Sequence, residues 1–201
     1  MNITIDHDHK YAVDGQRTPG VHEIMKAAGL IDFSGISSEV MAAAQANGKA
    51  VHSICELWDK GQLDEGSLDQ RGQWYLKSWQ KFRADYGINS FLAIEAMVGS
   101  SIFGYAGTLD RVFKYKSKII LADIKTGTGK KETVGIQTAA YAQAWKEMTG
   151  QRIDKRWCIN LDESKPRPER LKDKTDLGIF LAARTIWIWK KNNNLLDRIR
   201  K

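Results

Sequence analysis

The stretch Tyr105–Lys125, YAGTLDRVFKYKSKIILADIK, decides the fold. Both halves are rich in apolar, aromatic and β-branched residues, and Lys116-Ser117 between them suits a two-residue hairpin turn. In that register Asp110 faces Asp123. Facing side chains have Cβ atoms about 4.5–5.5 Å apart, and like charges at that distance are destabilising. The hairpin therefore predicts a cation between the two carboxylates.

Lys125 lies two residues after Asp123, so it projects from the same face of the strand. Magnesium prefers oxygen ligands and keeps several waters. Asp110, Asp123 and the backbone carbonyl of Ile124 would hold it, and Lys125 would stabilise charge on a phosphate. Manganese would substitute for magnesium. Asp110, Asp123 and Lys125 together predict metal-dependent hydrolysis of phosphodiester bonds. A single aspartate in a strand would instead be interpreted as a solvated residue on an exposed face.

The glycine-rich segment that follows, ILADIKTGTGKKE over residues 120–132, resembles a nucleotide-binding loop only superficially. A P-loop needs Gly, four residues and then Gly-Lys-Ser/Thr, because its amides wrap phosphates and its hydroxyl reaches magnesium. Ile124 stands where the first glycine should be, and Lys131 stands where the hydroxyl should be. We therefore expect no bound nucleotide.

Composition narrows the function further. The chain has 201 residues, with 31 Lys and Arg against 24 Asp and Glu, a formal charge of +7 that suits a polyanionic partner. Its two cysteines, Cys55 and Cys158, exclude a four-cysteine zinc or iron–sulfur site. The sequence shows neither a signal peptide nor an apolar run long enough to cross a membrane, so we expect a cytoplasmic protein.

The periodicity predicts an α/β fold with a mixed central sheet flanked by helices, in one domain over residues 1–201. An N-terminal arm and short helix (1–36) precede a core (37–161), and a C-terminal loop and helix follow (162–201). Within these parts the expected elements are a short hairpin or extended arm over 1–20, helices over 21–28, 37–60, 68–86, 131–149 and 174–192, and strands over 91–98, 105–115, 118–125 and 155–161.

The motifs GTLDRV, ILADIKTG and QTAAY, in this order, resemble those of the PD-(D/E)XK nuclease superfamily, in particular its RecB-like and bacteriophage exonuclease branch. Asp110 matches the first acidic position, and Asp123-Ile124-Lys125 matches the (D/E)XK motif. The segment YAVDGQRTPGVHEIMKAAGL also resembles the opening of phage-type members, with Gly20 and His22 in place of the usual serine and threonine. The resemblance runs from Tyr11 to about Leu161 and implies the αβββαβ core.

The resemblance also implies roles for residues outside the hairpin. Gly48 and His52 match a Gly-x-x-x-His element, which implies that the neutral imidazole of His52 ligates the metal; otherwise it is a core histidine. Glu95 is implied as a further acidic residue of the catalytic site. Gln137 and Tyr141 match a Gln-x-x-x-Tyr motif, which implies that they bind substrate; a core position is the alternative for the tyrosine. Independently of the resemblance, Lys130 and Lys131 follow the strand that carries Asp123 and Lys125, so we expect them to bind backbone phosphates, with a solvated charge pair as the alternative.

The function implied is that of a magnesium-dependent DNA exonuclease in phage recombination, replication or repair. A phage single-strand-annealing or single-strand-binding protein is an implied partner. An endonuclease of restriction or repair type is the first alternative. The second is a catalytically silent nucleic-acid-binding module, which the complete Asp110, Asp123 and Lys125 set disfavours.

Overall fold

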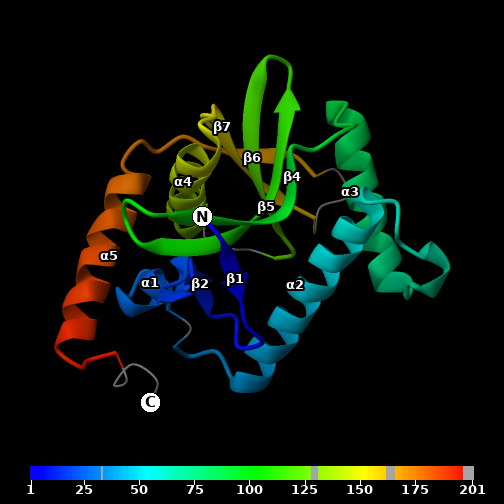
Figure 1. Cartoon of the computed structure of the whole chain (residues 1–201). Helices are drawn as coiled ribbons and strands as arrows, with labels where there is room; N and C mark the ends of the chain where they lie inside the picture. The colour runs from blue at the N-terminus through cyan, green and yellow to red at the C-terminus, as the bar shows by residue number, and fades with distance from the viewer. Residues whose placement is uncertain (33, 128–130, 162–165, 197–201) are drawn as a thin grey trace.

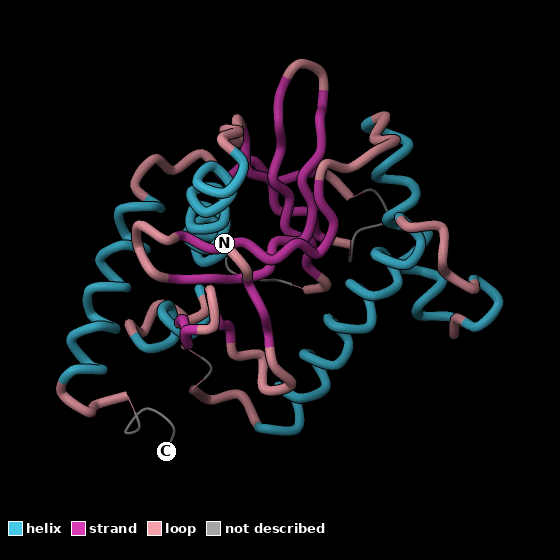
Figure 2. The backbone as a smooth tube through the Cα atoms, in the orientation of Figure 1, coloured by secondary structure: helices cyan, strands magenta, loops and turns pink. Residues whose placement is uncertain are grey.

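A mixed five-stranded sheet lies at the centre of the protein, in a computed structural model that describes residues 1–32, 34–127, 131–161 and 166–196. The strand order is β4-β5-β6-β7-β8; β6 and β7 run parallel, and the other neighbours are antiparallel. Figures 1 and 2 show this sheet between two groups of helices. Its strands are β4 (Ala93–Ser100), β5 (Tyr105–Tyr115), β6 (Lys118–Lys125), β7 (Lys155–Asn160) and β8 (Pro168–Leu171).

The β5–β6 hairpin has the register expected from the sequence. Tyr115 pairs with Lys118 and Arg111 pairs with Ala122, so the same register places Asp110 opposite Asp123. Lys116 has φ 55°, the left-handed conformation that a tight hairpin turn requires.

Each face of the sheet has its own core. On one face, α1 (Val21–Ala27), α4 (Lys131–Thr149) and α5 (Asp176–Asn192) pack against residues such as Leu121. On the other, α2 (Ser38–Asp59) and α3 (Gln70–Tyr86) cover Ile120, Ala122 and Ile124. Alternation along β6 therefore puts Asp123 and Lys125 on the α4 side.

The helix boundaries follow local signals in the sequence. The Ser37 side chain accepts a hydrogen bond from the Val40 N–H and caps the start of α2. Gly87 ends α3 with φ 61°. The short 3-10 helix η1 (Glu65–Ser67) lies between these two helices. The helix predicted over 131–149 is observed with those bounds and connects β6 to the parallel strand β7.

Two parts of the fold differ from the expectation. The N-terminal 20 residues form a three-stranded antiparallel sheet rather than one hairpin: β1 (Ile3–Ile5), β2 (Tyr11–Val13) and β3 (Gln16–Thr18). The C-terminal segment, predicted as loop and helix, also contains β8, which pairs with β7 at the sheet edge. Only four residues long, β8 begins with Pro168, which an edge strand tolerates at its first position, so the sequence gives little strand signal.

The N-terminal sheet is fixed to β5 beside the expected site. The Tyr11 hydroxyl lies 3.0 Å from the Thr108 hydroxyl, and the Ala106 N–H donates to the Pro19 carbonyl at 3.0 Å. Gly20 forms a bridge with Ala106 directly before α1 begins. These contacts place the first turn of α1 near the end of β6.

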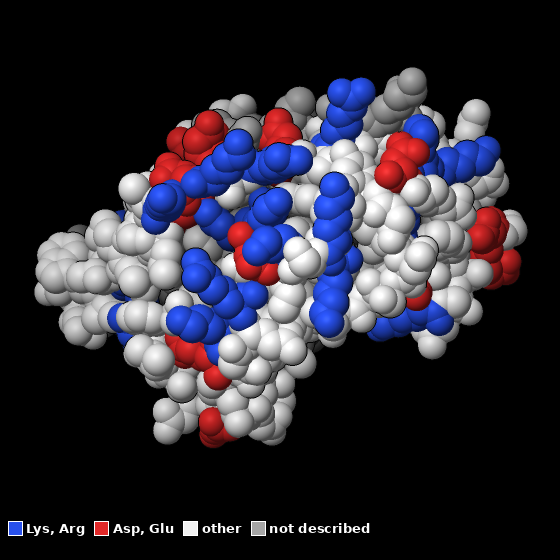
Figure 3. Space-filling model, turned by 90° about the horizontal axis from the view of Figure 1, so that it is seen from above, with Lys and Arg blue, Asp and Glu red and all other residues white. Residues whose placement is uncertain are grey.

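Lys and Arg side chains gather on the face that carries the β5–β6 turn, viewed from above in Figure 3. Across the described residues, no helix is long and apolar enough to cross a membrane.

Candidate active site

Three carboxylates occupy neighbouring positions on three adjacent strands. The β4–β5 register pairs Ile94 with Arg111 and Ala96 with Leu109, so Glu95 lies opposite Asp110. Asp110 in turn lies opposite Asp123 in the β5–β6 register. Asp110 and Asp123 are 7% and 2% exposed, so water screens their charges poorly. The row needs positive charge nearby.

Glu95 occupies its place with a strained backbone. Its φ is 43°, a left-handed value that a non-glycine residue rarely takes inside a strand. Such conformations cost about 1–3 kcal/mol and cluster at functional sites. The Glu95 carboxylate points toward His52, whose Nδ1 lies 3.2 Å from Glu95 Oε1.

His52 reaches the carboxylates from α2. Its Nδ1 lies 3.7 Å from Asp110 Oδ1, and its Nε2 lies 3.1 Å from the Ile124 carbonyl oxygen. The negative charge of Asp110, opposed by burial and reinforced by Glu95, raises the pKa of His52 to about 9. At that pKa the His52 ring is protonated at neutral pH, and it must lose the proton before the neutral ring can ligate a metal.

Lys125 supplies positive charge on the other side of the row. Its ammonium lies 2.7 Å from Asp123 Oδ2. Burial opposes a charge on Lys125, but Asp123 and Asp110 outweigh it and hold the pKa above its ordinary value. Burial raises the pKa of Asp123, which Lys125 partly offsets.

The donor set fits a divalent cation. Ligand atoms of His52, Glu95 and Asp110 all lie within 4.8 Å of one another. The Ile124 N–H donates to Asp110 Oδ2 at 2.6 Å, which fixes that carboxylate, and the Ile124 carbonyl oxygen lies beside the His52 ring. Carboxylate and carbonyl oxygens are the ligands that magnesium and manganese prefer. Asp123 stands next to this group, with its carboxylate bound to Lys125.

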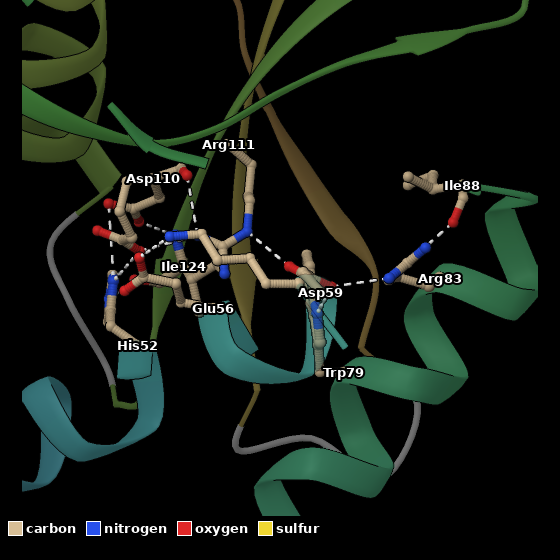
Figure 4. A network of polar contacts seen from close by, with 11 residues as sticks. His52, Glu56, Asp59, Trp79, Arg83, Ile88, Asp110, Arg111 and Ile124 are labelled. Carbon is tan, nitrogen blue, oxygen red and sulfur yellow. Dashed lines mark hydrogen bonds and ion pairs between the residues drawn. The ribbon is translucent and has the colours of Figure 1, made fainter. Parts of the chain in front are cut away.

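Behind the row lies a buried network that the sequence did not reveal (Figure 4). Arg111 is fully buried and donates from Nη1 to Glu95 Oε1 at 2.8 Å and from Nε to Asp59 Oδ2 at 2.8 Å. Asp59, at the end of α2, also accepts from Arg83 at 2.7 Å and from the Trp79 indole at 2.9 Å. Arg111 thus ties the strained Glu95 to both helices of this layer.

Gln137 and Tyr141 lie together on α4, and both are buried. The Gln137 amide donates to the Tyr141 hydroxyl at 3.3 Å. The Tyr141 ring packs in the core against Gly107, where a Cβ would lie 2.4 Å from Tyr141 Cε1. Burial raises the pKa of Tyr141 well above its usual range. These contacts explain a packing role; contact with substrate stays a prediction.

His22 was noted in the sequence only as a replacement for threonine, yet the structure places it at the site. It hydrogen-bonds with Gln137. Although His22 is exposed to solvent, the protein around its ring, followed by the charge of Lys125, lowers its pKa. Lys130 lies outside the described residues, and the side chain of Lys131, the first residue of α4, is likewise outside the description.

Comparison with known proteins assigns the family. The family model described as "PD-(D/E)XK nuclease superfamily" matches residues 21–184, which include all three carboxylates, His52 and Lys125. The chain belongs to the PD-(D/E)XK nuclease superfamily. Its members use divalent metals, in agreement with the donor set described above.

Other comparisons are weaker. A crystal structure from Eubacterium rectale that carries the provisional name of exonuclease matches with a TM-score of 0.46 and 13% identity, over 74% of this chain and 68% of that chain. No curated protein matches the chain. The family assignment therefore rests on the family model.

Removing Asp59 should destabilise the fold strongly. In Asp59→Ala, Arg83 loses its carboxylate partner and Arg111 keeps only Glu95. Removing one partner of a buried ion pair costs about 3–5 kcal/mol. Urea unfolding followed by circular dichroism measures the loss. The matched control is Asp85→Ala, which removes an exposed pair with Lys81 and should cost at most about 1 kcal/mol. Equal effects of the two variants would contradict a structural role for the network.

Proposed function

We propose that this PD-(D/E)XK nuclease is a magnesium-dependent DNA exonuclease of the phage type, acting in recombination, replication or repair. The observation that carries the proposal is the row of Glu95, Asp110 and Asp123, two of them buried, with Lys125 bound to its end. The RecB-like motif order supports the exonuclease branch. The basic composition, with a formal charge of +7, favours a nucleic-acid substrate. We further propose that residues 1–201 act as one nuclease domain in the cytoplasm.

In this proposal Asp110, Asp123 and the Ile124 carbonyl hold the ion, with His52 as a further ligand. When bound, the ion supplies an acidified water and neutralises charge on the scissile phosphate. The hydrogen bond from the Ile124 N–H fixes the orientation of the Asp110 carboxylate. Lys125 would release Asp123 to the ion and turn its ammonium to the phosphate, where the developing negative charge is greatest.

Substrate would be held by residues around this centre. Gln137 on α4 and His22 on α1 lie against each other, near Lys125. We propose that they contact the DNA near the reacting phosphate. Tyr141 would act with Gln137, and Lys130 and Lys131 would bind backbone phosphates. A single-strand-annealing protein as partner belongs to the same proposal and rests on the phage-type motifs alone.

Asp110→Asn and Asp123→Asn should each abolish cleavage of DNA and leave the fold intact. The amide is nearly isosteric with the carboxylate, but it binds a divalent ion far more weakly. The assay compares end-labelled linear DNA with closed circular DNA in magnesium. Loss of label from linear DNA alone supports an exonuclease, and cutting of circular DNA supports the endonuclease alternative. Wild-type turnover by a folded Asp123→Asn protein would refute the site.

Magnesium or manganese should raise the melting temperature of the wild-type protein, because the ion binds the folded state preferentially. The control is the double variant Asp110→Asn, Asp123→Asn, which should show a much smaller shift. Differential scanning fluorimetry over a range of metal concentrations measures both. A shift of the same size in the double variant would place the ion elsewhere.

Lys125 and Tyr141 should affect different kinetic constants. Lys125→Ala should lower kcat by about 10²-fold or more, as expected when one preorganised electrostatic donor is removed. Tyr141→Phe keeps the buried ring and should weaken DNA binding by about 1 kcal/mol if its hydroxyl meets the substrate. Binding in calcium and single-turnover rates in magnesium separate the two effects. An unchanged affinity and rate for Tyr141→Phe would leave that residue a purely structural role.

A further inference from the structure

Besides the positive side chains around the carboxylate row, the protein has a group of basic residues away from that row. A groove of about 620 Å³ runs between α4, the loop before β7, strand β8 and the start of α5. Ala139, Ala142, Ile153, Leu171 and Leu177 supply its apolar surface. Of its other lining residues, seven are Lys or Arg and two are Asp. The basic residues are Lys146, Arg152, Lys155, Arg156, Arg170, Lys172 and Lys174.

This groove is at the opposite end of the sheet from the catalytic cluster. Along the parallel pair β6–β7, Lys125 lies beside Asn160, whereas Ile120 lies beside Lys155. Five residues of strand at about 3.3 Å each separate the two ends by about 17 Å. The groove residues at the level of Lys155 are therefore well separated from a substrate atom at Lys125.

The acidic residues of the groove already have hydrogen-bond or ion-pair partners among the described residues of the protein, whereas several of its basic residues do not. Asp154 accepts a hydrogen bond from the Ile119 N–H and pairs with Lys118, and Asp173 accepts from the Thr175 N–H and hydroxyl. Arg156 is committed to Asp176 and to backbone carbonyls. By contrast, Lys146, Lys155 and Lys172 are exposed, and within the described part of the chain none of them forms an ion pair.

The positive surface continues from the groove to the tip of the β5–β6 hairpin. Lys114, Lys116 and Lys118 are exposed there, and Lys118 joins the tip to the groove through Asp154 at 3.5 Å. Figure 3 views this side of the molecule and shows Lys and Arg side chains over it. Exposed cations spread over several elements suit a ligand with regularly repeated negative charges better than a single anion.

We propose that this groove binds the phosphate backbone of a DNA strand at a site distinct from the catalytic centre. That the ligand is DNA rests on the proposed nuclease function. That it binds at this place rests on the basic residues that line the groove. Its basic side chains contact phosphates, and its apolar floor lies against sugars and bases. A strand held there extends the contact of the enzyme with DNA well past the scissile phosphate, so that binding on this side keeps the protein on its substrate between cleavage steps.

The test compares two triple variants that lose the same formal charge. Lys146→Gln, Lys155→Gln and Lys172→Gln remove charge from the groove. The control, Lys77→Gln, Lys81→Gln and Lys191→Gln, removes it from exposed positions on α3 and α5. Fluorescence anisotropy measures the binding of labelled 30-nucleotide single strands and 30-base-pair duplexes in EDTA at several salt concentrations. Melting temperatures verify that both variants are folded.

The groove variant should bind at least tenfold more weakly than the wild type at 100 mM salt, and the control should lose much less. With three phosphate contacts removed, the slope of log affinity against log salt should fall by about 2 for single strands or about 2.7 for duplexes. The DNA, single-stranded or duplex, whose affinity changes more is the form that the groove binds. Equal losses in both triple variants would overturn the proposal, as would a groove that binds poly-glutamate more tightly than DNA.

Because EDTA prevents cleavage, this result is independent of catalysis. Selective loss of DNA affinity in the groove variant supports the groove even if the wild-type protein cleaves no DNA, which would refute the proposed function alone. Normal cleavage of linear DNA together with unchanged affinity in the groove variant would overturn the groove and leave the proposed function intact.

Discussion

The repulsion among Glu95, Asp110 and Asp123 is the constraint on which the rest of the catalytic end depends. The three residues lie opposite one another on neighbouring strands, and two of them are almost completely buried. At effective dielectric constants near 20, two charges about 4 Å apart repel by about 4 kcal/mol. A fold that keeps such a row must surround it with positive charge.

Each element that borders the row contributes such a charge. Helix α2 brings the raised-pKa imidazole of His52 against Glu95 and Asp110. Strand β6 supplies Lys125, and strand β5 supplies Arg111 directly after Asp110. Since His52 touches both carboxylates and the Ile124 carbonyl, it lies where a shared cation would sit. Side-chain cations thus balance the charge of the row at positions that overlap with those a bound metal would take.

The sequence predicted the parts of this arrangement that depend on local pattern. Strand alternation and a two-residue turn were enough to place Asp110 opposite Asp123, and helix α4 was predicted with its observed bounds. Arg111 and Asp59 were missed because their contact joins residues 52 positions apart, which no periodicity encodes. The burial of Tyr141 depends on the absence of a side chain at Gly107, a packing detail that appears only in three dimensions. Strand β8 was missed because its signal is short and begins with proline.

The sheet also separates charge along its length, and this follows from the same constraint. Acidic side chains that bind a metal have to be concentrated, so the catalytic end of β5 and β6 repels the rest of a polyanion. The net charge of +7 cannot be placed among those carboxylates without neutralising the metal site. At the other end of β6 and β7 the exposed lysines of the groove lie apart from the carboxylates, and in the proposed function they would attract a long strand while the carboxylates engage a single phosphate through a bound cation. An enzyme that binds a polyanion through an acidic centre gains from placing its free positive charge at a distance from that centre.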